Sequence, residues 1–116
     1  TEIAPPAQEY LTISGENLSK YQFPIKSVDL LPGNINLWLC TKENQPLSNI
    51  NTYLKDDQGK ILYANKTGPN GYFLTNRIFP EGVYTVEFEG VVSGLPKLKI
   101  LLSKDFGKLP LKISVI

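Results

Sequence analysis

The sequence predicts an all-β domain, an antiparallel β-sandwich of two packed sheets. Nine glycines and nine prolines are spread through the 116 residues, and short runs of alternating apolar and polar residues recur between them. Such alternation is typical of strands with one buried face, and regularly spaced turns favour a sandwich. No stretch keeps a helical period for three turns, so we expect at most one helical turn, around residues 16–21.

The apolar alternation and the turn residues place the strands in order. We expect strands at residues 10–13, 25–31, 34–40, 50–54, 60–64, 72–75, 83–89, 97–102 and 109–115. Glycine, proline and aspartate mark the turns between them, at Ser14-Gly15, Pro32-Gly33, Asp56-Asp-Gln-Gly59, Pro69-Asn-Gly71 and Pro80-Glu-Gly82. Glycine supplies the positive φ that several tight turns require.

Three of these strands show which side chains should face inward. The expected inward-facing sets are Ile35, Leu37 and Leu39, then Ile50, Thr52 and Leu54, then Tyr84, Val86 and Phe88. The opposite face of the first set carries Asn36, Trp38 and Cys40, because successive side chains of a strand alternate between faces.

The domain organisation is simple. Residues 1–9 include Pro5-Pro6 and predict an extended linker. Residues 10–116 predict a single domain, and their alternation continues to the last residue. We expect the chain to be one module of a larger protein.

Composition excludes several classes of function. Apolar residues make up 41% and charged residues 20%, which is typical of a globular domain, and the net charge of +1 does not favour a nucleic-acid partner. The chain has no histidine and one cysteine, Cys40, which excludes histidine-dependent catalysis, histidine-bound zinc and an internal disulfide. No apolar run is long enough for a membrane helix. We expect no catalytic residues, no metal and no cofactor.

One group of aromatic and amide side chains suggests a binding face. If residues 34–40 and 50–54 pair as a hairpin, Trp38 and Asn36 would lie near Tyr53 and Asn51. A flat aromatic ring beside amides can stack on a sugar and hydrogen-bond to it. The alternative is that residues 10–31 cover this face and bury Trp38.

Other polar groups carry structural explanations. Asp56 and Asp57 fit a solvated turn better than a calcium site, which needs more oxygen ligands. Lys97 and Lys99 share one face of a strand, where lysine guards against edge-to-edge aggregation. The alternative is a basic face for an acidic cell-wall polymer, lipid headgroups or nucleic acid. Ser103 and Lys104 are adjacent, so on a strand they would point apart.

The middle of the chain resembles a known family. The carrying segments are Gln45-Pro46-Leu47-Ser48-Asn49-Ile50, Leu54-Lys-Asp-Asp-Gln-Gly59, Lys66-Thr67-Gly-Pro-Asn-Gly71-Tyr-Phe73 and Ile78-Phe-Pro-Glu-Gly82-Val-Tyr84-Thr-Val86. In order and spacing they resemble the carboxypeptidase-regulatory-like, or transthyretin-like, β-sandwich modules over about half of the chain. The resemblance implies an Ig-like or prealbumin-like Greek key with a family-like core at residues 34–116. Its structural residues would be Gly59, Gly71, Phe73, Gly82 and Tyr84.

Two relatives of that family suggest chemistry that this sequence does not support. The hydroxyisourate hydrolases rely on histidines, which are absent here. The collagen-adhesin B-type stalk domains often join a lysine to an asparagine or aspartate with the help of a buried glutamate. The corresponding positions hold Leu39 and Phe88, so we expect no internal isopeptide bond.

The resemblance therefore implies a non-catalytic structural or protein-interaction module. We expect it to belong to a bacterial surface or secreted protein, in an extracellular or cell-surface location. Its expected partners are neighbouring domains or another protein, near a membrane only through its parent protein. One alternative is a carbohydrate-binding module that uses Asn36, Trp38, Asn51 and Tyr53 on polysaccharide. Another is an accessory domain that stabilises an adjoining enzyme.

Overall fold

The computed structural model describes residues 10–22, 33–89, 94–106 and 110–115, and in these residues the chain is mostly β. The strands are β1 (Tyr10–Ile13), β2 (Leu37–Cys40), β3 (Asn51–Lys55), β4 (Ile61–Lys66), β5 (Tyr72–Phe73), β6 (Gly82–Glu89), β7 (Lys97–Leu102) and β8 (Leu111–Ser114), and helix α1 spans Leu18–Tyr21. The all-β prediction is confirmed. The expected linker at residues 1–9, the expected strand at 25–31 and the predicted start of the last strand at 109 lie outside the described residues.

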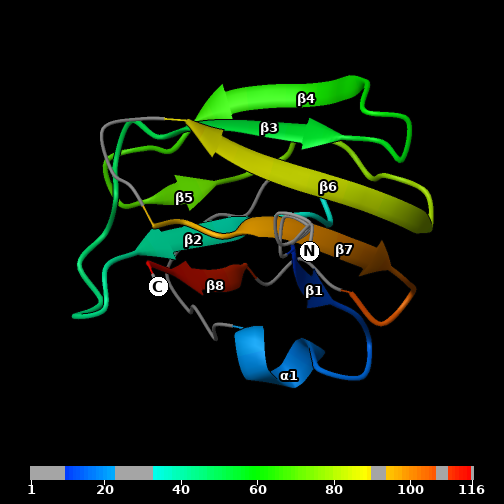
Figure 1. Cartoon of the computed structure of the whole chain (residues 1–116), viewed down its shortest axis with the longest axis horizontal. Coiled ribbons are helices and arrows are strands. Elements are labelled where there is room, and N and C mark those ends of the chain that lie inside the picture. The colour runs from blue at the N-terminus through cyan, green and yellow to red at the C-terminus, as the bar shows by residue number, and fades with distance from the viewer. Residues whose placement is uncertain (1–9, 23–32, 90–93, 107–109, 116) are drawn as a thin grey trace, which may run out of the picture.

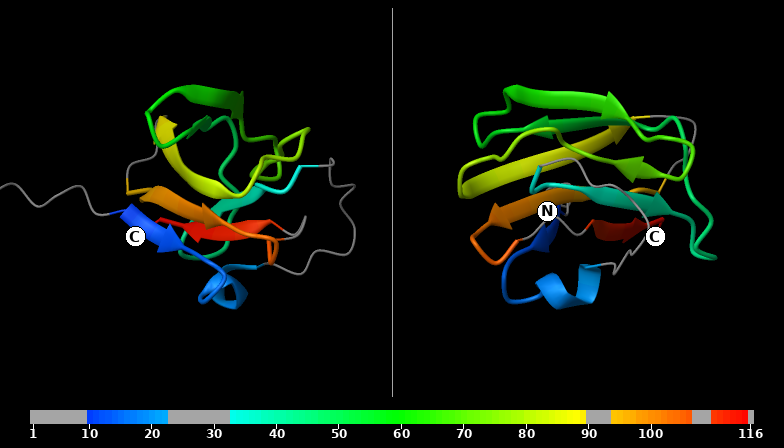
Figure 2. Two further views of the ribbon diagram at one scale, coloured as in Figure 1. Left: turned by 90° about the vertical axis from the view of Figure 1, so that its right-hand side faces the viewer. Right: turned by 180° about the vertical axis from the view of Figure 1, so that it is seen from behind.

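The strands form two sheets (Figure 1). One has five strands in the order β1-β7-β6-β3-β4, and the other has three in the order β5-β2-β8. The end-on view in Figure 2 shows the strands arranged around a shared interior, with α1 beside β8 and outside the sheets. Within the described part of the chain, no helix is long and apolar enough to cross a membrane.

The expectation of purely antiparallel sheets is wrong, because each sheet contains one parallel pair. β1 runs parallel to β7, and β2 runs parallel to β8, with four residue pairs in register in each case. The remaining neighbours are antiparallel. A parallel pair requires a long connection, and the segments between these partners contain most of the other strands.

Apolar side chains from both sheets fill the interior. The fully buried members of this core are Ile13, Ile35, Leu37, Leu39, Ile50, Leu54, Phe73, Val86, Leu98, Ile100 and Ile113. The predicted inward faces agree with this core, with Thr52 and Tyr84 also buried and Phe88 half-buried. Because burial of apolar area is the main driving force of folding, the alternation in the sequence locates the core correctly.

Strand β2 is buried on both faces. Asn36 precedes it and is 1% exposed, because its side-chain amide holds two loops together. It donates to the Gly33 carbonyl at 3.1 Å and accepts from the Thr75 N–H at 2.9 Å. Polar groups buried in this way are tolerated because they are hydrogen-bonded.

The segment from Thr67 to Phe73 has a physical explanation at each of its characteristic residues. The buried Thr67 hydroxyl donates to the Leu47 carbonyl at 2.7 Å and accepts from the Ile50 N–H at 3.0 Å. Gly71 has a φ of 84°, and a Cβ there would lie 2.6 Å from the Leu39 carbonyl oxygen. Phe73 is buried in the core. The segment therefore fixes the hairpin that leads into β5.

Candidate functional site

The four side chains predicted to form an aromatic and amide face do not come together. Trp38 and Asn36 belong to the region of β2 in the three-stranded sheet, whereas Tyr53 and Asn51 lie on β3 in the five-stranded sheet. The hairpin between β2 and β3 is not formed, because the segment between them carries the chain to the other sheet. These residues therefore do not form a shared platform for a sugar ring.

Trp38 is part of the packing. Its side chain is 8% exposed, and its indole N–H donates to the Asn70 carbonyl at 2.8 Å. The Tyr72 ring lies 6.4 Å away between centroids, and the Lys112 ammonium lies 5.9 Å from the Trp38 ring centroid. Each of these contacts joins β2 to a neighbouring strand or turn, so the indole stabilises the smaller sheet.

Tyr53 lies on the outer face of the larger sheet among charged side chains. Its hydroxyl donates to Glu89 Oε1 at 3.0 Å, and this hydrogen bond raises the pKa of the Tyr53 phenol. Lys55, two residues along the same strand, forms an ion pair with Glu87 at 3.2 Å. Asn51 is half-buried and pairs with Glu89 across the strands. This face carries a solvated polar network.

The residues predicted to be structural lie in turns and in the core. Gly59, like Gly71, has a φ of 84°, and Gly82 has a φ of 158°. Phe73 and Tyr84 are buried, and the Tyr84 ring packs edge-on against Phe79, 5.9 Å away between centroids.

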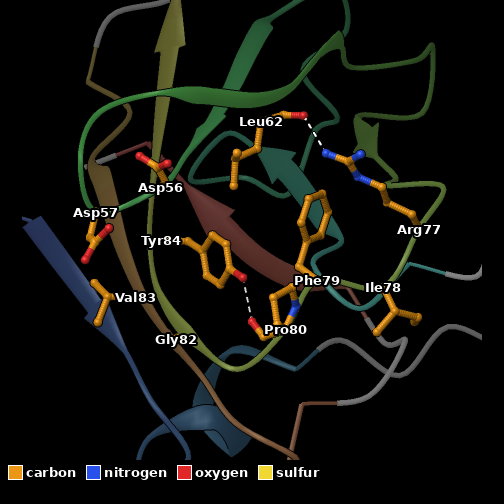
Figure 3. A pocket seen from close by; sticks show the side chains of 10 residues that line it. All are labelled: Asp56, Asp57, Leu62, Arg77, Ile78, Phe79, Pro80, Gly82, Val83 and Tyr84. Atoms are coloured by element: carbon orange, nitrogen blue, oxygen red, sulfur yellow. Dashed lines mark hydrogen bonds between the residues drawn. The ribbon is translucent and has the colours of Figure 1, made fainter.

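A cleft at the β3–β4 turn end of the larger sheet is the strongest candidate site in the described residues. We call it the rim cleft; its volume is about 540 Å³. It is lined by Asp56, Asp57, Leu62, Arg77, Ile78, Phe79, Pro80, Gly82, Val83 and Tyr84. Figure 3 shows the rings of Phe79 and Tyr84 between the two carboxylates on one side and the Arg77 side chain on the other. The rim cleft is thus an apolar depression with charge at opposite sides.

Two large apolar side chains lining the cleft are exposed. Ile78 is 61% exposed and Val83 is 39% exposed, although burial of either would be favourable. Exposed apolar groups are common singly, but here they border a concave surface that already has apolar walls. Such a combination is typical of a binding surface.

Hydrogen bonds hold the wall of the rim cleft in place. The Asn34 side-chain amide forms two hydrogen bonds with the backbone of Phe79. Its Nδ2 donates to the Phe79 carbonyl at 3.0 Å, and its Oδ1 accepts from the Phe79 N–H at 3.1 Å. Arg77 donates to the Leu62 carbonyl at 2.8 Å, and its guanidinium carbon lies 4.8 Å from the Phe79 ring centroid. The Tyr84 hydroxyl donates to the Pro80 carbonyl at 2.5 Å. The wall is therefore held by contacts within the chain.

The acidic side of the rim cleft is a turn. Asp56 Oδ1 accepts from the N–H groups of Gln58 and Lys60, each at 2.9 Å. Asp57 is exposed and takes part in no ion pair among the described residues. In the same part of the chain, no group of three or more acidic or cysteine side chains is arranged to hold a metal.

The two nucleophile candidates raised by the sequence, Cys40 and Ser103, do not line the rim cleft. Cys40 is fully buried, and burial raises the pKa of its thiol, which disfavours the reactive thiolate. The Ser103 hydroxyl accepts from the Asp105 N–H at 3.3 Å in a turn, while Lys104 is exposed. These groups have structural surroundings, and the rim cleft offers shape, apolar surface and charge.

The sequence gives only a weak signal for the rim cleft. Ile78 and Val83 flank Pro80-Glu-Gly82, and this segment predicts a turn with no indication that its apolar neighbours stay exposed. The comparisons add no relative: no protein-family model matches the chain, and no curated protein matches it in sequence.

Proposed function

We propose that this chain is a non-catalytic β-sandwich module that docks a protein segment in the rim cleft, as part of a larger extracellular or cell-surface protein of bacteria. The observation that carries the proposal is the preformed apolar cleft with Ile78 and Val83 exposed at its edge. The docked segment belongs to a neighbouring domain or to another protein. In either case the module positions its partner and catalyses no reaction.

We also propose that the fold is a Greek key of the prealbumin-like group. Tyr84 stands near the start of β6, and its hydroxyl bonds to the backbone carbonyl four residues upstream. This arrangement resembles the tyrosine corner of Greek-key sandwiches, which supports the proposal. After β4 the chain crosses to the other sheet as β5 and then returns as β6, which pairs with β3. Such a crossover between two sheets is expected of a Greek key.

Docking accounts for the chemistry of the site better than catalysis does. The chain has no histidine, and its one thiol is buried away from the rim cleft. Polysaccharide binding through Trp38 and Tyr53 has less support, because the two rings lie in different sheets. A cleft whose wall is held by hydrogen bonds loses little conformational entropy when a partner binds, which favours affinity.

The test is a selection of peptides from a random phage-displayed library on the immobilised 116-residue chain. We expect enriched peptides that bind the wild-type chain and lose binding to Ile78→Asp. The matched control is Ile61→Asp, because Ile61 is 52% exposed and does not line the rim cleft. Failure to enrich any peptide, or equal loss on both variants, would refute docking in this cleft.

A further inference from the structure

We infer that the rim cleft takes an extended peptide in which a bulky apolar side chain stands beside a lysine or arginine. The inference rests on the proposed docking function and specifies the chemistry of the partner. It follows from the unequal state of the charges at the two sides of the cleft.

The positively charged group of the cleft, the Arg77 guanidinium, already has contacts with residues that line the cleft. The Arg77 guanidinium donates to the Leu62 carbonyl at 2.8 Å and stacks over Phe79 at 4.8 Å. Its position is thereby set on the side opposite the turn, as Figure 3 shows. It is a fixed donor suited to a peptide carbonyl or carboxylate, and it leaves the turn side without a cation.

The negative charge at the turn side is not neutralised by the lysines of the same turn. Lys55 is paired with Glu87 at 3.2 Å, on the outer face of the sheet. Lys60 is exposed and does not line the rim cleft. Asp56 Oδ1 accepts from the turn's own N–H groups, but neither Asp56 nor Asp57 forms an ion pair among the described residues. The two carboxylates therefore keep a negative charge that a partner's cation complements.

An apolar side chain is the matching group for the space between the charges. The floor is formed by the rings of Phe79 and Tyr84, and the walls include Leu62, Ile78 and Val83. Burying the exposed parts of Ile78 and Val83 supplies the driving force, because removing apolar surface from water is favourable. The exposed ion pairs add selectivity more than strength.

An extended peptide places these groups in the required order. Side chains two residues apart in an extended chain lie on the same side, about 7 Å from each other. An apolar anchor over the aromatic floor thus puts a neighbouring cationic side chain within reach of the turn carboxylates. The backbone of the bound peptide then continues toward Arg77. We predict the motif as one apolar residue with lysine or arginine two positions away.

The experiment is a titration of the isotope-labelled chain with four synthetic peptides, followed by NMR shifts of the backbone amides. Three peptides share a phenylalanine anchor and differ in flanking residues: lysine, glutamate or serine. The fourth has the lysines and glycine in place of phenylalanine. We expect the lysine-flanked peptide to shift amides around the rim cleft and to bind about tenfold more tightly than the glutamate-flanked one, at up to about fivefold per ion pair.

Two variants separate charge selection from docking itself. Asp56→Asn with Asp57→Asn should remove the preference for the lysine-flanked over the glutamate-flanked peptide, whereas Ile78→Asp should weaken all three anchored peptides. Equal binding of the three anchored peptides would overturn the charge inference and leave the docking proposal intact. Equal binding of the lysine peptide that lacks phenylalanine, or no shifts at the cleft with any peptide, would also overturn the inference. In the last case the phage selection decides independently whether the cleft docks anything.

Discussion

Replacing Thr67 by valine tests whether its buried hydroxyl joins the end of β4 to the loop that precedes β3. Thr67 is 2% exposed, and its hydroxyl is bonded to both the Leu47 carbonyl and the Ile50 N–H, at 2.7 and 3.0 Å. Valine has nearly the same shape as threonine. The substitution therefore removes two hydrogen bonds without opening a cavity.

The magnitude follows from the two backbone groups that lose their partner. A buried donor or acceptor left unsatisfied costs about 1–3 kcal/mol. The added methyl group returns about 0.8 kcal/mol through the hydrophobic effect. We therefore expect Thr67→Val to lower the free energy of unfolding by roughly 1–5 kcal/mol, a large part of the total stability of an ordinary domain. Thr67→Ser keeps the hydroxyl and should cost only about 1 kcal/mol, the loss of one methyl group.

The assay is urea unfolding of the wild-type chain and both variants, with Trp38 fluorescence as the signal. The expected order of stability is wild type, then Thr67→Ser, then Thr67→Val, with similar dependence on urea concentration. Between the two variants, the expected order of stability is the reverse of their hydrophobicity, because valine is the more hydrophobic residue. A valine variant as stable as the wild type, or more stable than the serine variant, would refute the reasoning.

Three further predictions concern glycine, tryptophan and tyrosine. Gly71→Ala should destabilise the chain more than Gly59→Ala does in urea unfolding, because both glycines have a φ of 84° but only Gly71 has a backbone oxygen within 2.6 Å of a new Cβ. Equal losses would contradict this. Trp38, being 8% exposed, should emit in the blue and resist acrylamide quenching, and red, readily quenched emission would show that its surroundings are misassigned. Burial raises the pKa of the Tyr84 phenol above its ordinary value of 10.0, so the folded state holds this proton more tightly than the unfolded state does. The stabilisation from this protonated phenol should be fully present below pH 10.0 and should be lost as the pH rises further, which thermal melts at alkaline pH would record as a falling melting temperature. The fall should be smaller in Tyr84→Phe, and a fall of the same size would argue against Tyr84 as its source.

The local pattern of the sequence predicts strands well where one face is buried and the other is wet. The segment at 97–102 is predicted with its bounds correct, because Leu98 and Ile100 are buried while Lys99 between them is exposed. The same alternation does not reveal that both faces of β2 are buried. Asn36 is polar, yet it lies in the interior because its amide is hydrogen-bonded to Gly33 nearby and to Thr75 in a distant part of the chain.

Partners in a sheet are less accessible to sequence reasoning than the strands themselves. Alternation says which side chains share a face and says nothing about which strand lies alongside. Trp38 and Tyr53 were expected to be neighbours from the order of their strands, and the two strands belong to different sheets. The rim cleft was missed for the same reason, since its lining comes from the β3–β4 hairpin and from a second segment at residues 77–84.

The two parallel strand pairs have a consequence for a module that transmits tension. If the chain is pulled at the β1 side and at the β8 side, β1 is drawn toward its N-terminal end while β7 is held through the connection to β8. In the same way β2 and β8 are drawn in opposite directions along their common axis. Each pair has four residues in register, so the load falls on all of its backbone hydrogen bonds in shear. Under a pull along the strands, such bonds would have to break together rather than one after another, so the fold would resist extension in that direction.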